Sequence, residues 1–138
     1  MSNKLLIFGS GFLVKHITEE HLKEGWDVNI LYNNHKVVDV EDLLQHRLDD
    51  INIVGFIGKY KPSYILFAAG DSFVSDNVSV EMAIKKNVVG AVQILNLLST
   101  SDISSFLHKI IVIGSAAEYH NTHLPLNERD DILPSSIY

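Results

Sequence analysis

Residues 5–14 read LLIFGSGFLV, and this stretch decides the fold. Its first four residues form a continuous apolar run of strand length, which is typical of a strand covered on both faces. Gly9 and Gly11 end the run, and a helix is expected over about residues 13–24, before Gly25, because glycine is common just past a helix end. A strand, a glycine turn and a helix in this order predict the start of a parallel α/β sheet.

The rest of the chain repeats this alternation of short apolar runs and helix-period segments. Further strand-length runs lie at residues 28–32, 64–69 and 110–113. One helix is expected from about Leu43, ending before Pro62, and another over residues 80–98, whose apolar residues recur at the spacing of one buried face. Residues 116–138 are expected to be rich in loops. The pattern predicts an α/β fold with a doubly wound parallel sheet, and another three-layer α/β fold is the alternative.

The composition excludes several classes of protein. The chain has 138 residues, 46% of them hydrophobic and 20% charged, which fits one globular domain. It contains no cysteine, so disulfides, cysteine-ligated zinc and a thiol nucleophile are excluded. The net charge of −6 argues against nucleic acid as a partner, because phosphate binding needs clustered Lys and Arg. No apolar run approaches the roughly 18 residues that span a bilayer, and the start does not resemble a signal peptide. We therefore expect a cytoplasmic protein without a membrane partner.

The turn between the first strand and the first helix is a candidate site. Two glycines let the chain turn tightly, so that backbone N–H groups can approach a pyrophosphate at the helix N-terminus. Val14 stands where the third glycine of this fingerprint is expected, and its side chain either moves the helix away from the strand or fills a gap there. The alternative is a tight turn in a protein that binds nothing. The candidate cofactor-binding residues of this turn are Gly9, Ser10, Gly11, Phe12 and Leu13.

The corner after the second strand bears on the choice between NAD and NADP. Sheets of this type that bind NAD carry Asp or Glu there, to bind the ribose hydroxyls. This chain has Asn33 and Asn34 instead, followed by Lys36. We therefore name Asn33 as a cofactor-binding residue. The missing acid and the nearby Lys36 favour NADP, although a lysine in a surface loop is more often only solvated.

Further motifs follow one another in an order that resembles a known family. The motifs are the strand, turn and helix at 5–28, VDV at 38–40, KPSYILFAA at 61–69, NVVG at 87–90, SAAEY at 115–119, PLNE at 125–128 and PSSIY at 134–138. This series resembles the extended short-chain dehydrogenase/reductase family, the NAD(P)-dependent epimerases, dehydratases and reductases of nucleotide sugars. The resemblance implies a Rossmann-like NAD(P)-binding domain.

The resemblance also implies roles for individual residues. The segment 38–40 is similar to the family's short third strand, whose Asp contacts the adenine. Tyr138 is implied as the base that removes a proton from the sugar hydroxyl, with Ser115 as its partner at the developing oxyanion. A tyrosine pKa of about 10 must fall for this role, and in the family a lysine four positions later lowers it. The further cofactor-binding residues implied are Asp39, Val40, Ala68, Ala69, Gly70 and Asn87.

Structural explanations compete with several of these roles. Ser115 at a strand end is also explained as a cap or turn residue, and Tyr138 as a frayed terminus. Asn87 is also explained as a buried amide that needs hydrogen-bond partners. His120 and His123 are three residues apart but have no third ligand in their loop, so no metal site is predicted.

The sequence stops at Tyr138, before the motif lysine. We expect residues 1–138 to form an incomplete dinucleotide-binding domain, truncated before its last strands and without the substrate domain. A fragment of a longer enzyme, a natural truncation and a degenerate relative are the possible explanations, and a fragment would expose apolar surface and self-associate, for example as a homodimer. The expected function is the cofactor-binding portion of an NAD(P)-dependent nucleotide-sugar epimerase, dehydratase or reductase, inactive alone, with a nucleotide sugar as partner of the full-length protein. A non-catalytic NAD(P)-binding sensor or interaction protein is the alternative.

Overall fold

The fold is built on a parallel β-sheet. The structure is a computed structural model that describes residues 2–37, 40, 43–70, 79–99, 102–119 and 125–134. Within these residues five strands pair in the order β3-β2-β1-β4-β5, all parallel. The strands are β1 (Lys4–Phe8), β2 (Asp27–Tyr32), β3 (Leu44–Arg47), β4 (Tyr64–Phe67) and β5 (Lys109–Val112). The predicted doubly wound parallel sheet is therefore confirmed, and β1 lies at its centre.

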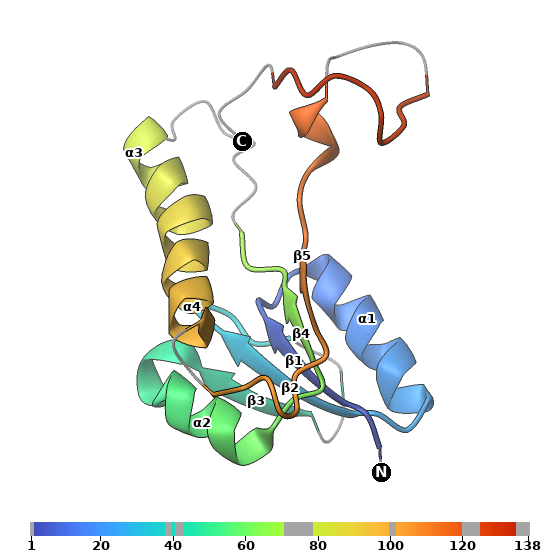
Figure 1. Cartoon of the computed structure of the whole chain (residues 1–138), viewed down its shortest axis with the longest axis vertical. Coiled ribbons are helices and arrows are strands. Elements are labelled where there is room, and N and C mark those ends of the chain that lie inside the picture. The colour runs from blue at the N-terminus through green and yellow to red at the C-terminus, as the bar shows by residue number, and fades with distance from the viewer. Residues whose placement is uncertain are drawn as a thin grey trace.

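Helices cover both faces of this sheet. Helix α1 (Phe12–Lys23) packs on one face through Val14 and Ile17. Helix α2 (Ile53–Tyr60) lies on the other face, beside a long helix made of α3 (Val80–Ala83), a π-helical segment (Ile84–Val89) and α4 (Gly90–Ser99) (Figure 1). This double cover explains the continuous apolar runs in β1 and β4, since side chains on both faces of these strands are buried.

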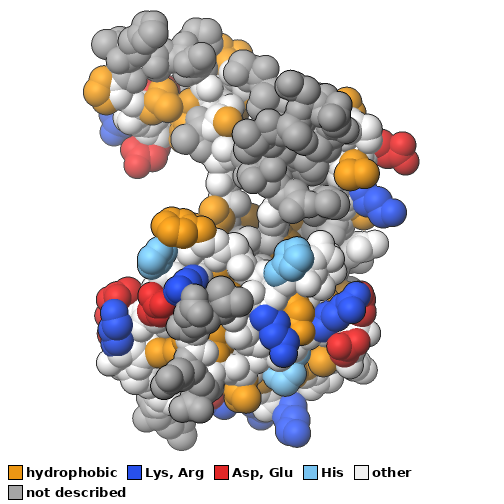
Figure 2. All heavy atoms as spheres, turned by 180° about the vertical axis from the view of Figure 1, so that it is seen from behind, with side chains coloured by type: hydrophobic (Ala, Val, Ile, Leu, Met, Phe, Trp, Pro, Cys, Tyr) orange, Lys and Arg blue, Asp and Glu red, His pale blue; other side chains and the backbone are white. Residues whose placement is uncertain are grey.

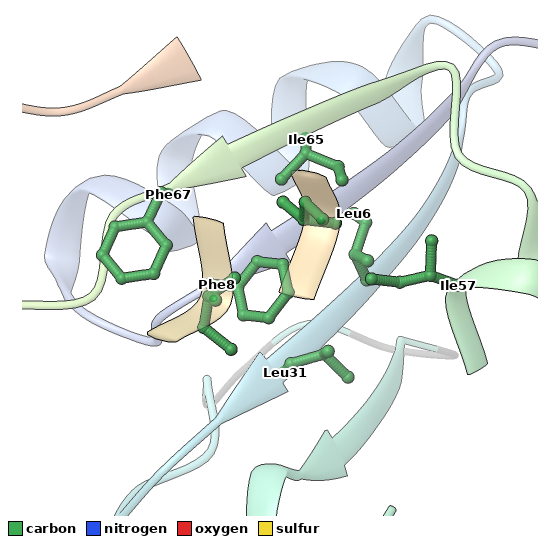
Figure 3. Close-up of a cluster of buried hydrophobic side chains, with 8 residues drawn as sticks. Leu6, Phe8, Leu31, Ile57, Ile65 and Phe67 are labelled. Atoms are coloured by element: carbon green, nitrogen blue, oxygen red, sulfur yellow. The ribbon is translucent and has the colours of Figure 1, made fainter. Parts of the chain in front are cut away.

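The two faces of β1 show how the core is divided. Leu6 and Phe8 point to the side of α2 and α4, and Figure 3 shows them packed with Leu31, Ile57 and other buried residues. Leu5 and Ile7 belong to the cluster on the α1 side. The rings of Phe8 and Phe67 stack with their centroids 5.9 Å apart. Because Phe8 and Phe67 are the last residues of β1 and β4, this packing fixes the two strands where they reach the carboxyl edge of the sheet.

The helix predicted from Leu43 is wrong in its first part. Residues 44–47 form β3, residues 48–50 a 3-10 turn, and the helix begins only at Ile53. Contacts of Gln45 and His46 favour a strand over the expected helix here. The Gln45 side-chain amide hydrogen-bonds the backbone of Val37, and the His46 ring packs on Phe56. The third strand is expected at 38–40, but β3 is formed by residues 44–47. Val40 lies in no strand, and residues 38 and 39 are outside the described residues.

The long helix lies where it is predicted, but its apolar face is only partly buried. Ala83, Ile94 and Leu98 are buried and Ala91 is half-buried, whereas Val80, Ile84, Val88 and Leu95, also expected on the buried face, are exposed. The buried residues Ile94 and Leu98 lie in α4, which packs beside the sheet, whereas α3 extends beyond the sheet (Figure 1). Figure 2 shows hydrophobic side chains on the surface at the end of the molecule beyond the sheet. The exposed apolar residues of the long helix are Val80, Met82, Ile84, Val88, Val89, Val92, Leu95 and Leu97.

A half-buried polar cluster ties α2 to the amino edge of the sheet. The Tyr60 hydroxyl lies 2.7 Å from the Asp27 carbonyl oxygen and 3.2 Å from its carboxylate Oδ1. The Lys4 ammonium donates to the Tyr60 carbonyl oxygen at 3.0 Å. Burial raises the pKa of the Tyr60 hydroxyl well above its ordinary value, and the nearby Asp27 carboxylate adds to the rise. The folded protein therefore favours the neutral phenol.

We expect Tyr60→Phe to lower the free energy of unfolding by about 1 kcal/mol near neutral pH, because the hydrogen bond to Asp27 is lost. The raised pKa means that the native Tyr60 contributes fully below about pH 10 and loses this contribution as the pH rises further. The difference between the native chain and Tyr60→Phe should therefore shrink above about pH 10. Urea denaturation at several pH values measures it, with Tyr64→Phe as control. A constant difference would contradict this account.

Candidate functional site

Several of the predicted cofactor-binding residues follow strand ends at one edge of the sheet. Gly9 directly follows β1, Asn33 follows β2 and Ala68 follows β4, and in a parallel sheet the carboxyl ends of all strands meet at the same edge. Helix α1 covers one face and the long helix the other. The edge between β1 and β4 is therefore the topological switch point, where open α/β sheets bind ligands.

Gly9 brings the ends of β1 and β4 close together. Its φ is +122°, and a Cβ atom on it would lie 2.6 Å from the Ala68 carbonyl oxygen and 2.9 Å from the Ala69 nitrogen. The Gly9 N–H donates to the Leu31 carbonyl oxygen at 2.9 Å, and the Ala68 N–H donates to that of Phe8 at 2.8 Å. Only glycine fits this place, because both its dihedral angle and the space exclude a side chain.

The start of α1 faces open space. Gly11 is its N-cap residue and provides no side-chain cap, and the first turn of the helix carries no acidic residue. A Cβ atom on Gly11 would meet nothing within 4 Å. The Phe12 ring beside the turn is 81% exposed and contacts His16 edge-on at 4.5 Å. Backbone N–H groups at such a helix start, with the positive end of the helix dipole, suit a phosphate group.

Val14 fills a gap between α1 and the sheet. It is 1% exposed and belongs to the core cluster that contains Ile7, Val28 and Ile30. Of the two outcomes expected for a valine at the position of the third glycine, the structure shows the second. The Val14 side chain is part of the core below the turn.

Asn87 lies against the strand-end segment after β4. A Cβ atom on Gly70 would be 3.5 Å from the Asn87 side-chain oxygen. Asn87 belongs to the π-helical segment, a distortion that is frequent at functional sites. The structure thus brings Asn87 next to Gly70, as expected for residues of one site.

The predicted catalytic residues are only partly described. The Ser115 hydroxyl accepts a hydrogen bond from the Ala117 N–H at 3.1 Å, and the Glu118 N–H donates to the Ser115 carbonyl oxygen at 3.2 Å. Ser115 therefore caps the 3-10 turn Ala116–Glu118, and its O–H proton can still donate. Tyr138 and Asp39 lie outside the described residues.

Three residues at the corner of β2 and β3 belong near the site although the sequence did not single them out. Tyr32 ends β2, opposite Arg47 at the end of β3, and Gln45 bonds the loop between the two strands. Lys36 of this loop lies with its Nζ 6.0 Å from the centre of the Tyr32 ring. The helix expected from about Leu43 concealed the relation between Gln45 and Arg47. Residues two apart lie on one face of a strand but not of a helix.

Neither a metal centre nor a membrane span is found among the described residues. In this part of the chain no three His, Cys, Asp or Glu side chains are grouped so that they could hold a metal ion, and His120 and His123 are outside it. None of the helices described is long and apolar enough to cross a membrane.

A family model agrees with the fold and the glycine turn. The model described as the NAD dependent epimerase/dehydratase family matches residues 5–138. The chain belongs to this family. The resemblance seen in the sequence is thereby confirmed, and membership in the NAD dependent epimerase/dehydratase family extends from β1 to the end of the chain.

Solved structures similar to this family member share its fold. A UDP-glucose 4-epimerase from Brucella ovis in complex with NAD is 21% identical, with a TM-score of 0.83 over 99% of this chain and 43% of its own. The UDP-glucose 4-epimerase from Thermus thermophilus, also in complex with NAD, is 20% identical, with a TM-score of 0.73 over 98% of this chain and 46% of its own. MoeE5 in complex with UDP-glucose and NAD is 18% identical, with a TM-score of 0.79 over 99% of this chain and 44% of its own. This chain therefore spans less than half the length of these proteins. The comparison with curated proteins finds no match.

Proposed function

We propose that this chain is the cofactor-binding portion of an NAD(P)-dependent enzyme that epimerises, dehydrates or reduces a nucleotide sugar. The observation that carries the proposal is the Gly9 turn, where a positive φ and the contact with Ala68 leave room only for backbone. Beside it, the uncapped start of α1 offers N–H groups to an anion. The NAD and UDP-glucose complexes of structural neighbours agree with this class of ligand.

The residues present fit a dinucleotide at the switch point. Residues 9–13 would hold its pyrophosphate with backbone N–H groups. Asn33, the segment 68–70 and Asn87 lie along the same edge of the sheet, and Asp39 and Val40 remain proposed for the adenine. When bound, the cofactor supplies hydride transfer.

Two residues of the chain are proposed for proton chemistry. The Ser115 hydroxyl, which keeps its proton available, would donate a hydrogen bond to the oxygen of the reacting sugar carbon. Tyr138 would take the proton of the sugar hydroxyl. This role requires the pKa of Tyr138 to lie below the ordinary tyrosine value of about 10. Because this chain spans less than half the length of its structural neighbours, we propose that it is inactive alone.

The partner, location and cofactor choice complete the proposal. The exposed apolar residues of the long helix support association with a second copy of the chain. A cytoplasmic location remains proposed from the sequence. NADP is proposed over NAD, because neutral Asn33 and Asn34 follow β2 and the charged Lys36 lies nearby.

We expect titration calorimetry of the full chain to show binding of NADPH or NAD below about 1 mM. Gly11→Val should weaken binding at least about tenfold, a loss of roughly 1.4 kcal/mol, because the new side chain fills the open space before α1. It should not unfold the protein, since Gly11 has an ordinary extended backbone and no close neighbour.

Gly58→Val is the matched control for this test. Gly58 lies in α2, and a Cβ atom there also meets nothing within 4 Å. It should leave cofactor binding unchanged. If neither dinucleotide binds the native chain below about 1 mM, or if both variants bind alike, the proposed function is wrong.

A further inference from the structure

The outer edge of β5 is open in the part of the chain that the structure describes. There β5 pairs with β4 on one side and with no strand on the other. The Ile113 N–H donates to the Phe67 carbonyl oxygen at 2.9 Å, which extends the pairing by one residue. Alternate residues of a strand bond the same neighbour, so the backbone groups of Ile111 face β4 and those of Ile110 and Val112 face outward. Such an edge is a template for a further strand.

The side chains along this edge are apolar on both faces of the sheet. Ile111 and Ile113 are 44% and 42% exposed on one face, and Val112 is 53% exposed on the other. Natural edge strands often carry a charge or a proline that prevents pairing with another chain, and residues 110–113, IIVI, contain neither. The long helix also exposes apolar side chains, but its backbone groups are bonded within the helix. The edge of β5 offers both kinds of contact.

The charges at the two ends of the edge favour an antiparallel second copy over a parallel one. Lys109 begins β5 and is exposed. Beyond the other end, the Glu118 carboxylate turns back toward the strand, with its Oε2 3.7 Å from the position of a Cβ atom on Gly114. A parallel copy in the same register would place two lysines side by side, which is unfavourable. An antiparallel copy separates the lysines and brings each of them to the end where Glu118 of the other copy lies.

We propose that β5 pairs antiparallel with β5 of a second copy of this chain and joins the two sheets into one. The inference rests on the association with a second copy included in the proposed function, and it names the surface. The two-fold axis passes beside Ile111. Ile110 then exchanges hydrogen bonds with Val112 of the other copy, and the two Ile111 residues face each other in a pair that is not hydrogen-bonded. Because β5 has four residues, the interface is small, and we expect a dissociation constant of about 100 µM.

An introduced cysteine reports this pairing, because the chain contains none. The Cα atoms of a facing, non-hydrogen-bonded pair are about 4.5 Å apart, which suits a disulfide. Ile111→Cys at about 100 µM should therefore form a covalent dimer under mild oxidation, seen by non-reducing electrophoresis. Val112→Cys is the matched control. The native side chain is more exposed there, but the two cysteines would be diagonal neighbours about 7–8 Å apart, too far for an unstrained disulfide.

We expect Ile111→Cys to cross-link at least about tenfold faster than Val112→Cys, because facing cysteines hold the geometry of a disulfide and diagonal ones do not. Equal rates would show a parallel pair or random collision and would overturn the antiparallel pairing. Failure of both variants to cross-link would overturn it as well. The pairing does not involve the Gly9 turn, so either failure leaves the proposed cofactor site standing, which dinucleotide titration tests separately.

Sedimentation velocity on cysteine-free chains gives an independent test. Ile111→Lys places two positive charges opposite each other at the centre of the pair. It should make the chain monomeric at about 100 µM, with an unchanged circular dichroism spectrum, because the native side chain is already 44% exposed. Val92→Lys is the control on the long helix, where Val92 is 57% exposed, and it should leave the association intact. A monomeric native chain, or loss of association in Val92→Lys alone, would overturn the proposal.

Discussion

A Gly9→Ala variant is expected to lose about 2–5 kcal/mol of the free energy of unfolding and to bind no dinucleotide. Its Cβ atom would lie 2.6 Å from the Ala68 carbonyl oxygen, a backbone atom that moves only if β4 moves. The φ of +122° adds strain for any residue with a side chain. Both effects displace the strand ends that form the proposed site. Urea denaturation measures the stability and calorimetry the binding.

Two other glycines separate these effects. Gly25 has a φ of +79° with nothing within 4 Å of a Cβ atom, so Gly25→Ala carries only the dihedral penalty of about 1–2 kcal/mol. Gly11→Ala carries neither penalty and should change stability by a few tenths of a kcal/mol. If Gly9→Ala loses no more stability than Gly25→Ala, the close contact between the ends of β1 and β4 is wrong.

The central part of the sheet was predictable because its signal is strong and local. Residues 5–8 are a continuous apolar run, residues 28–32 are apolar apart from Asn29, and the strands β1 and β2 lie there within one residue. Strand β4 follows the same rule. Burial on both faces demands apolar residues at consecutive positions, so a reader of the sequence sees the strand directly.

Strand β3 was not predictable in this way. Within the described part of the chain it pairs with one strand, β2, and it carries Gln45, His46 and Arg47, so its sequence lacks the apolar run. Leucines before and after it happen to recur at helical spacing. Its strand state depends on contacts with residues far along the chain, such as Val37 and Phe56. Tertiary contacts of this kind override the local pattern.

The candidate site follows the same division. The Gly9 turn was visible because its glycines stand directly after a strand, and the structure adds the contact with Ala68 that explains the first of them. The proximity of Asn87 to Gly70 is a contact between two separate segments of the chain, which helix periodicity does not reveal. Lys36 was visible as a charge in the sequence. The sequence did not show that Gln45 and Arg47 lie beside β2, because this depends on the pairing of β3 with β2.

Val14→Gly, which restores the glycine of the dinucleotide fingerprint, is expected to lower the free energy of unfolding by about 2–4 kcal/mol. Val14 is 1% exposed and packs with Ile7 and Val28 in the core under α1. Its removal leaves a cavity, and glycine inside a helix adds about 1 kcal/mol. Chemical denaturation measures the loss. Val14→Ala retains the helix preference and should lose only the cavity part.

Dinucleotide affinity in the same variant decides what the valine does. The Val14 side chain points into the core, so its removal should not tighten binding by the molecules that remain folded. Tighter binding by Val14→Gly with unchanged stability would mean that valine obstructs the phosphate site. With the expected result, the position serves helix packing. A glycine there allows α1 to approach the strand closely, whereas in this chain the Val14 side chain packs between α1 and the sheet. Of the three positions of the glycine fingerprint, Gly9 and Gly11 then remain for the proposed phosphate site.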